Sequence, residues 1–425
     1  MKKFRQVRLS VFAALLGLSA VSAIVPTSAY ADTPAADTPA PVEPIKPEIR
    51  TILVAAKELY DAKNIAGALS KIAESDAIAN KTPYEIFAIE KTRGDYYFAS
   101  GDKANAAKAF EAVVGSKTLR HADQLSMTQA VGQLYFQLSN YPLTITWIQR
   151  YITEGGTDPR AQDVLNKAHY LNKDYADAYK GFNAQVQAVI AAGKVPDEQS
   201  LQLLLTSANA LKDEQGTLNA LEQLNSYYPS VKNWTYLISQ IHTKPGYSDK
   251  LLLDIYRLKL ELGLIKTGPE YTDMAELATR AGLPAEAKKA LEQGYAVGIL
   301  GKGADAKKNA ILLEAANRRA ADDLKTMQQG EIGANKSKDG TGLVNLGMAF
   351  ATAGQFDKGV SLIEQGIAKG GLVHLEEAKL HLGLVYYWGG KKAEAIKQLA
   401  TVEGTDGTAD LARYWIEQFN HPLVK

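Results

Sequence analysis

The stretch LVNLGMAFATAGQFDKGVSLIEQGIAKGG, Leu343 to Gly371, is followed by a second stretch of the same design, EEAKLHLGLVYYWGGKKAEAIKQLATVEG, Glu376 to Gly404. Corresponding residues keep a constant offset, as between Gly347 and Gly383. Within each stretch, apolar residues recur at steps of three and four, which is the spacing of one buried helix face. Each stretch therefore predicts two helices joined by a turn.

Small residues stand where the two predicted helices must approach each other closely, Gly347 on the first and Gly359 on the second. Gly354 falls between the helices, where a residue that tolerates left-handed backbone lets the chain reverse. A helix pair of this length cannot bury its own apolar face. Stacking on a further pair has to complete the core, so the unit has to repeat.

This pattern resembles the tetratricopeptide repeat (TPR) family, whose repeat carries a small residue, an aromatic, Gly, a second aromatic, a small residue and a bulky apolar residue in that order. The first stretch supplies Gly347, Phe350, Gly354, Phe356, Gly359 and Ile363. The second supplies Gly383, Tyr386, Gly390, Ala395 and Leu399, but Lys392 replaces the second aromatic. The resemblance implies an all-α fold, an α-solenoid of about ten antiparallel helix pairs wound as a right-handed superhelix.

Weaker copies of the pattern cover much of the remaining chain, with Ala56, Gly94, Gly132, Asn166 and Ala208 at the first small position. The pattern degenerates in the middle of the chain. There, residues 331–342 are polar and glycine-containing and predict a loop. We expect a signal peptide (1–31), a proline-rich disordered linker (32–47), an N-terminal TPR-like array (48–230), a degenerate helical-repeat section (231–340) and a C-terminal TPR pair with a capping helix (341–425).

The N-terminus predicts export. Basic residues precede an apolar run, Val11 to Val25, and Ala29-Tyr30-Ala31 is typical of a signal-peptide cleavage site. We expect cleavage after Ala31 and a periplasmic location, with full export as an alternative. A retained membrane anchor is a further alternative, although the run is shorter than the roughly 20 residues that span a bilayer.

Composition excludes several classes of protein. The chain has 425 residues and no cysteine, which excludes disulfides, thiol catalysis, cysteine-based metal sites and lipid attachment to cysteine. Its 48 basic and 47 acidic residues nearly balance. We therefore expect no general attraction to nucleic acid.

The sequence contains no recognisable catalytic, cofactor or metal motif. Gly298 to Gly303 is glycine-rich, but it lacks the spacing of a phosphate-binding loop and follows no predicted strand. His374, Glu377 and His381 share one face of a predicted helix, a geometry that a metal ion can use, but ordinary core or surface histidines are the favoured interpretation. We therefore expect no catalytic residue, no cofactor and no metal ion.

The TPR resemblance implies that certain positions of each first helix face a concave groove that binds a partner. Carried over residue by residue, these positions are Lys91, Asp95, Phe98, Gln129, Gln133, Phe136, Gln137, Asp163, Lys167, Tyr170, Glu377, Tyr387 and Trp388. Such a mixture of amides, charges and rings suits a peptide or a helix. It lacks the Lys and Asn pattern with which chaperone-binding members hold a terminal carboxylate, so that class of partner is disfavoured.

Our main hypothesis is a non-enzymatic protein–protein interaction scaffold of the bacterial envelope, which binds a peptide or protein segment of an unidentified envelope partner in its concave groove. One alternative is an accessory protein for cell-wall or polysaccharide binding or export, in which exposed rings stack on sugars. Another is an α/α-toroid hydrolase or lyase, whose helices close into a circle. An open superhelix counts against this last alternative.

Overall fold

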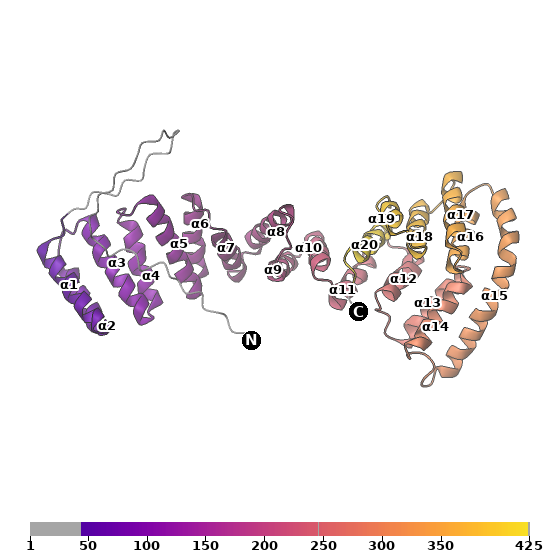
Figure 1. Cartoon of the computed structure of the whole chain (residues 1–425), viewed down its shortest axis with the longest axis horizontal. Coiled ribbons are helices and arrows are strands. Elements are labelled where there is room, and N and C mark those ends of the chain that lie inside the picture. Colours follow the sequence, from indigo (N-terminus) through magenta and orange to yellow (C-terminus); the bar gives the residue numbers. More distant parts are fainter. Residues whose placement is uncertain (1–43, 245, 424–425) are drawn as a thin grey trace, which may run out of the picture. The chain divides into compact units, whose positions relative to one another are not determined.

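The computed structural model describes residues 44–244 and 246–423, and within them the regular structure is twenty α-helices and two short 3-10 helices, with no strand (Figure 1). The all-α prediction is confirmed. The predicted signal peptide, its cleavage site and most of the proline-rich linker lie outside the described residues. The chain divides into two compact units, residues 1–134 and 135–425, and each is considered by itself.

The first unit contains helix pairs that pack side by side. Its helices are α1 (Pro47–Asp61), α2 (Ile65–Ala73), η1 (Glu74–Ala77), α3 (Pro83–Ser100), α4 (Lys103–Gly115) and most of α5 (His121–Gln137). The start of α3 is fixed by a capping box, in which Thr82 accepts from the backbone N–H of Glu85 and the Glu85 carboxylate accepts from that of Thr82. Glu85 also accepts from the backbone N–H of Lys46 at 2.8 Å, so it ties the residue before α1 to α3.

The first part of the second unit continues with helices that contact one another in chain order. They are α6 (Tyr141–Thr153), α7 (Pro159–Leu171), α8 (Tyr175–Ala191), α9 (Glu198–Ala210) and α10 (Glu214–Tyr227). Phe182, Leu201 and Leu204 are fully buried between α8, α9 and α10. Each pair buries its apolar stripe against the next pair, as the repeat argument requires.

The turn inside the helix pairs uses left-handed backbone at one recurring position. Gly101, Gly354 and Gly390 have φ of +85°, +87° and +78° there, and each ends the first helix of its pair. The same position is taken by non-glycine residues in other repeats, Lys63, Ser139, Lys173 and Lys212, with φ between 57° and 67°. The turn therefore keeps its left-handed backbone even in repeats where another residue replaces glycine.

The small residues of the stretch from Leu343 to Gly371 allow direct backbone contact between α16 (Thr341–Thr352) and α17 (Phe356–Lys369). A Cβ atom on Gly347 would lie 2.8 Å from the Gly359 carbonyl oxygen, and one on Gly359 would lie 2.7 Å from that of Gly347. In the following pair, a Cβ atom on Gly383 would lie 2.6 Å from the Leu399 side chain. At Gly347 and Gly359 nothing larger than hydrogen fits without moving a helix, and at Gly383 the Leu399 side chain would have to shift.

The rest of the second unit, residues 231–420, is named here the C-terminal ring. Its helices are α11 (Val231–Ile241), η2 (Asp249–Leu251), α12 (Leu252–Glu261), α13 (Gly268–Arg280), α14 (Pro284–Ala296), α15 (Ala306–Lys336), α16, α17, α18 (Leu375–Trp388), α19 (Lys392–Leu399) and α20 (Thr408–Asn420). The last helix, α20, packs back on α12, so these helices form a closed circle (Figure 1). One apolar cluster includes Trp234 and Leu258 from the start of the ring and Trp415 and Phe419 from its end.

The predicted loop at 331–342 is wrong over its first half, because α15 runs unbroken to Lys336. Gly330 and Gly333 lower helix propensity in this segment. Tertiary contacts outweigh that cost: the Glu331 carboxylate pairs with Lys358 at 2.7 Å, and Ala334 packs against the apolar core.

Candidate functional site

A pocket of about 690 Å³ opens inside the C-terminal ring. Two neighbouring helices contribute most of its lining: Ala285, Lys288, Lys289 and Glu292 of α14, and Asn317, Ala320, Ala321 and Leu324 of α15. Each set is spaced by three and four residues, so each is one continuous face of its helix. The pocket is therefore formed by regular helices rather than by loops.

The remaining walls come from helices on the opposite side of the ring. Arg257 and Glu261 belong to α12, Phe356 begins α17, and Trp388 ends α18. The Trp388 ring lies 6.0 Å from the Arg257 guanidinium carbon, which is within reach of a cation–π contact. The volume falls within the roughly 300–1,000 Å³ typical of ligand sites.

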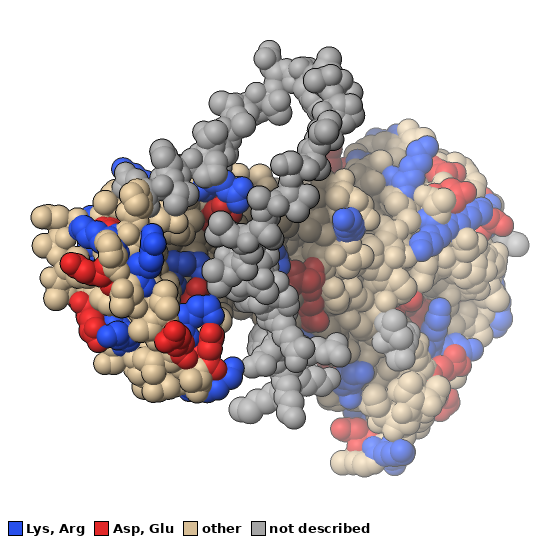
Figure 2. Space-filling model, turned by 60° about the vertical axis from the view of Figure 1, so that its left-hand side comes forward, with Lys and Arg blue, Asp and Glu red and all other residues tan. Residues whose placement is uncertain are grey.

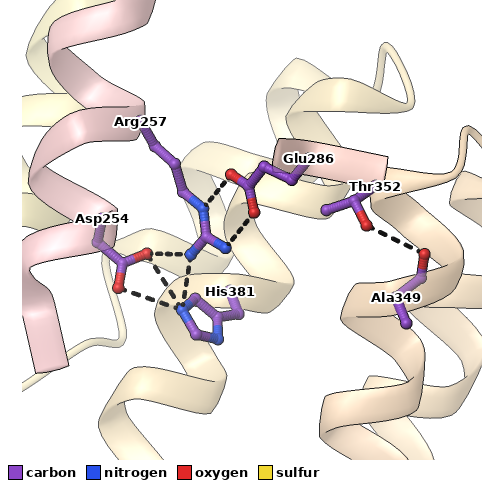
Figure 3. A network of polar contacts seen from close by, with 6 residues as sticks. All are labelled: Asp254, Arg257, Glu286, Ala349, Thr352 and His381. Atoms are coloured by element: carbon purple, nitrogen blue, oxygen red, sulfur yellow. Dashed lines mark hydrogen bonds and ion pairs between the residues drawn. The ribbon is translucent and has the colours of Figure 1, made fainter. Parts of the chain in front are cut away.

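A buried ionic network joins α12, α14 and α18 beside this pocket (Figure 3). The Arg257 guanidinium donates to both carboxylate oxygens of Glu286 at 2.7 Å and to Asp254 at 2.6 Å. His381 Nε2 lies 3.1 Å from the same Asp254 oxygen. Since Arg257 is only 4% exposed and Asp254 only 1%, the network is shielded from water.

The charges of the network stabilise one another. Burial opposes ionisation of Asp254, but the charges of His381 and Arg257, together with their hydrogen bonds, outweigh it and lower its pKa to about 2. Burial also disfavours the guanidinium, yet Glu286 and Asp254 raise the pKa of Arg257. Every charged group therefore has its counter-charge in place, and the network links helices distant in sequence.

The metal interpretation of the histidines, which the sequence disfavours, is only partly matched by the geometry. Ligand atoms of Asp254, Glu377 and His381 all lie within 4.8 Å of one another. An Arg257 nitrogen already lies 2.6 Å from the Asp254 oxygen and 3.2 Å from His381 Nε2. The guanidinium therefore already supplies the positive charge between these two ligand atoms. His374 is exposed and lies away from this group, with its Nε2 2.7 Å from the Lys250 amine.

The predicted groove residues in α3 and α5 are partly accessible. Lys91 and Asp95 form an ion pair of 2.6 Å one turn before Phe98, which is 43% exposed. On α5, Gln129 and Gln133 are half-buried. Phe136 is also half-buried, with its ring edge-on to Tyr141 at 6.0 Å, and Gln137 is exposed.

The predicted groove residues of α7 repeat the same arrangement. Asp163 and Lys167 form an ion pair of 2.7 Å, with the order of charges reversed relative to α3. Tyr170 follows and is half-buried, with its ring edge-on to Tyr175 at 5.8 Å.

The three predicted residues of α18 have different surroundings. Glu377 lies in the cluster with His381, and Tyr387 stacks on Phe419 at 4.1 Å while donating to Glu261 at 2.9 Å. Trp388 alone of the three lines the pocket. Sequence reasoning missed the pocket residues of α14 and α15, whose only signal was a helical spacing of small and polar residues.

Charge on the surface is mixed. On the face that Figure 2 presents, basic and acidic side chains alternate over short distances in both units. This distribution agrees with the near balance of the composition. Within residues 44–244 and 246–423, no helix combines the length and apolar character needed to cross a bilayer.

Comparison with known proteins identifies the class of repeat. The tetratricopeptide repeat family matches residues 91–159, which hold α4, α5 and α6 whole together with the second half of α3. These residues resemble tetratricopeptide repeats, as the sequence pattern indicated, and the described residues form an all-helical, solenoid-like fold. Proteins of this family are generally non-catalytic scaffolds that bind other proteins.

Solved structures with a similar chain course also carry such repeats. They include a tetratricopeptide repeat protein from Parabacteroides merdae (10% identity, 80% of this chain and 98% of that one, TM-score 0.29). The C-terminal part of a TPR repeat-containing protein from Cytophaga hutchinsonii has 14% identity over 63% of this chain and 93% of its own, with TM-score 0.29. No curated protein sequence matches the chain. At these sequence identities and TM-scores, the similar structures do not indicate what the chain binds.

Proposed function

We propose that the chain is a non-enzymatic scaffold of the bacterial envelope that binds a protein or peptide segment on the inner faces of its repeats. The repeat family supports the scaffold role, because such proteins bind protein partners. The basic start, the apolar run and the cleavage-site pattern of the N-terminus support the envelope location.

One observation carries the binding proposal. An aromatic ring stands four residues after the first small position in three successive repeats, as Phe98, Phe136 and Tyr170. In α3 and α7 an ion pair precedes the ring by one turn. Rings supply the contact area on which affinity depends, and polar groups beside them fix the register of a bound segment.

The test is a crosslinked pull-down from an envelope extract, followed by mass spectrometry. The variant Phe98→Ala/Phe136→Ala/Tyr170→Ala removes the three rings. A control, Val54→Ala/Val195→Ala/Val231→Ala, removes three apolar side chains that are more exposed than the rings and lie at none of the proposed positions. We expect a partner protein that the wild type and the control capture and the ring variant loses. Equal capture by all three chains would refute the proposal.

The location is tested separately by fractionating producing cells and sequencing the N-terminus of the recovered protein. We expect the protein in the periplasmic fraction with Asp32 as its first residue. Recovery in the cytoplasm with residues 1–31 intact would contradict the envelope role.

The closed ring gives the α/α-toroid alternative the topology that it requires. An enzyme of that kind also needs a carboxyl group free to exchange protons with a substrate. Both Asp254 and Glu286 are engaged by Arg257, Glu261 accepts the hydroxyl of Tyr387, and Glu292 lies 3.7 Å from the Lys288 amine. These contacts favour the scaffold over the hydrolase or lyase.

A further inference from the structure

We propose that the pocket of the C-terminal ring is a second binding site, which takes a protein segment bearing a bulky apolar side chain with a carboxylate close to it. The proposal rests on the proposed function in one respect, that the partner is a protein. It adds a site formed by other helices than the repeats of the N-terminal half and a chemical description of what fills it.

The apolar part of the pocket can accommodate a large apolar side chain. On the α15 wall, Leu324 is 51% exposed although it lines a concave surface, and the residues one turn before it are only alanines, Ala320 and Ala321. Phe356, which is half-buried, adds apolar surface to another wall. A partly exposed leucine beside small residues leaves both apolar area and room for an entering side chain.

The charges of the pocket leave one cation without a partner. Arg257 is fully engaged by Asp254 and Glu286, and the Lys288 amine lies 3.7 Å from Glu292. Lys289, also on α14, is exposed and bonds no acidic group within the described part of the chain. A carboxylate on the entering segment would complement this lysine, and a cation there would be repelled.

Two side-chain amides complete the description. Gln293 on α14 and Asn317 on α15 line the pocket, and the side-chain amide of neither bonds any residue that the structure describes. Each offers a donor and an acceptor, which are the groups that a peptide bond requires. The segment can therefore be held by its backbone as well as by its side chains.

A sugar is the competing occupant, because Trp388 stands in the lining. Its ring is already partnered by Arg257, and the α15 wall of alanines and Leu324 offers nothing to the hydroxyl groups of a saccharide, which leaves only the polar side chains of the pocket to bond them. The pocket favours an apolar side chain over a glycan.

The experiment selects random short peptides, displayed on phage, on the purified full chain, with counter-selection on a Leu324→Glu variant. We expect enriched peptides to share a bulky apolar residue with Asp or Glu within about one helical turn, the reach over which side chains share a face. The proposal would be overturned if the enriched peptides lacked an acidic residue, or if no peptide were enriched. Retention of peptidoglycan fragments or chitooligosaccharides instead, lost in the Leu324→Glu variant, would assign the pocket to glycans.

An enriched peptide, labelled with a fluorophore, is then titrated against variants by anisotropy. Leu324→Glu should lower affinity about tenfold or more, as loss of a central contact does. Lys289→Glu should weaken the acidic peptide and strengthen its Asp→Lys or Glu→Lys counterpart, reversing their order. The control Ile311→Glu changes an equally exposed residue of α15 outside the pocket and should leave affinity unchanged. An unchanged order of the two peptides would refute the charge argument.

The proposed function and the pocket proposal can be refuted independently of each other. The Phe98→Ala/Phe136→Ala/Tyr170→Ala variant should bind the selected peptide as the wild type does, because none of these residues lines the pocket. If the pull-down succeeds and the selection fails, only the pocket proposal falls. If the selection succeeds and the pull-down fails, only the binding role of the repeats falls.

Discussion

Replacing Arg257 with alanine should destabilise the second unit by about 3–5 kcal/mol, because it leaves buried charges without a partner. Arg257 is 4% exposed and bonds both Asp254 and Glu286, so two carboxylates would lose their counter-charge together. The pKa of Asp254 is lowered from 3.8 to about 2 against the effect of burial, by His381 and Arg257 together. A shift of that size corresponds to about 2 kcal/mol for this one carboxylate.

The assay is denaturant unfolding followed by tryptophan fluorescence. Three of the four tryptophans, Trp234, Trp388 and Trp415, belong to the C-terminal ring and report its unfolding. The control is Arg160→Ala, which removes a guanidinium bonded to Asp158 on the surface, with 80% of its side chain exposed. We expect no measurable change in the control, because exposed ion pairs contribute little.

A triple replacement separates charge from packing. Asp254→Leu/Arg257→Met/Glu286→Leu removes all three charges together and fills similar volume, so it should recover most of the stability that Arg257→Ala loses. An Arg257→Ala chain that unfolds at the same denaturant concentration as the wild type would refute the reasoning that the network holds the ring together.

Three further predictions concern the same architecture. The folded-state pKa of Asp254 (about 2) lies below its ordinary value of 3.8, so its ionised form stabilises the fold above pH 3.8, and this contribution is lost as the pH falls toward 2. Unfolding measured as a function of pH should show this loss of stability, and the Asp254→Asn variant should not show it. Lys173→Gly, at a φ of +67°, should raise stability by about 0.5–1 kcal/mol in thermal unfolding, and a lower melting temperature would contradict the strain argument. Gly383→Leu should cost about 1–3 kcal/mol through overpacking against Leu399, and an unchanged melting temperature would show that the helices do not meet there.

The helix pairs were predictable because their signals are local. The constant offset of the repeats, the close approach at Gly347 and Gly359 and the left-handed turn at Gly354 all follow from residues within one repeat. Helix spacing and turn chemistry act over a few residues, so one sequence contains them completely.

The closure of the ring was not predictable in the same way. It depends on contacts such as Arg257 with His381 and Tyr387 with Glu261, between residues more than 120 positions apart, and no repeat pattern marks them. The long helix α15 has no repeat signature, and its extension to Lys336 depends on tertiary contacts of Glu331 and Ala334. Trp388 was among the proposed partner-binding residues, but Leu324 and Lys289 become neighbours of one pocket only when the ring closes.

The measurement that tests the closed ring and its pocket most directly is the proximity of Lys250 and His374, whose side-chain nitrogens lie 2.7 Å apart between η2 and the residue preceding α18. Because the chain has no cysteine, the Lys250→Cys/His374→Cys variant takes nitroxide spin labels at these two positions alone. A closed ring predicts strong dipolar broadening in the spectrum of the doubly labelled chain, which disappears on unfolding. A spectrum equal to the sum of the two singly labelled chains would mean that the ring is open and that the pocket does not exist.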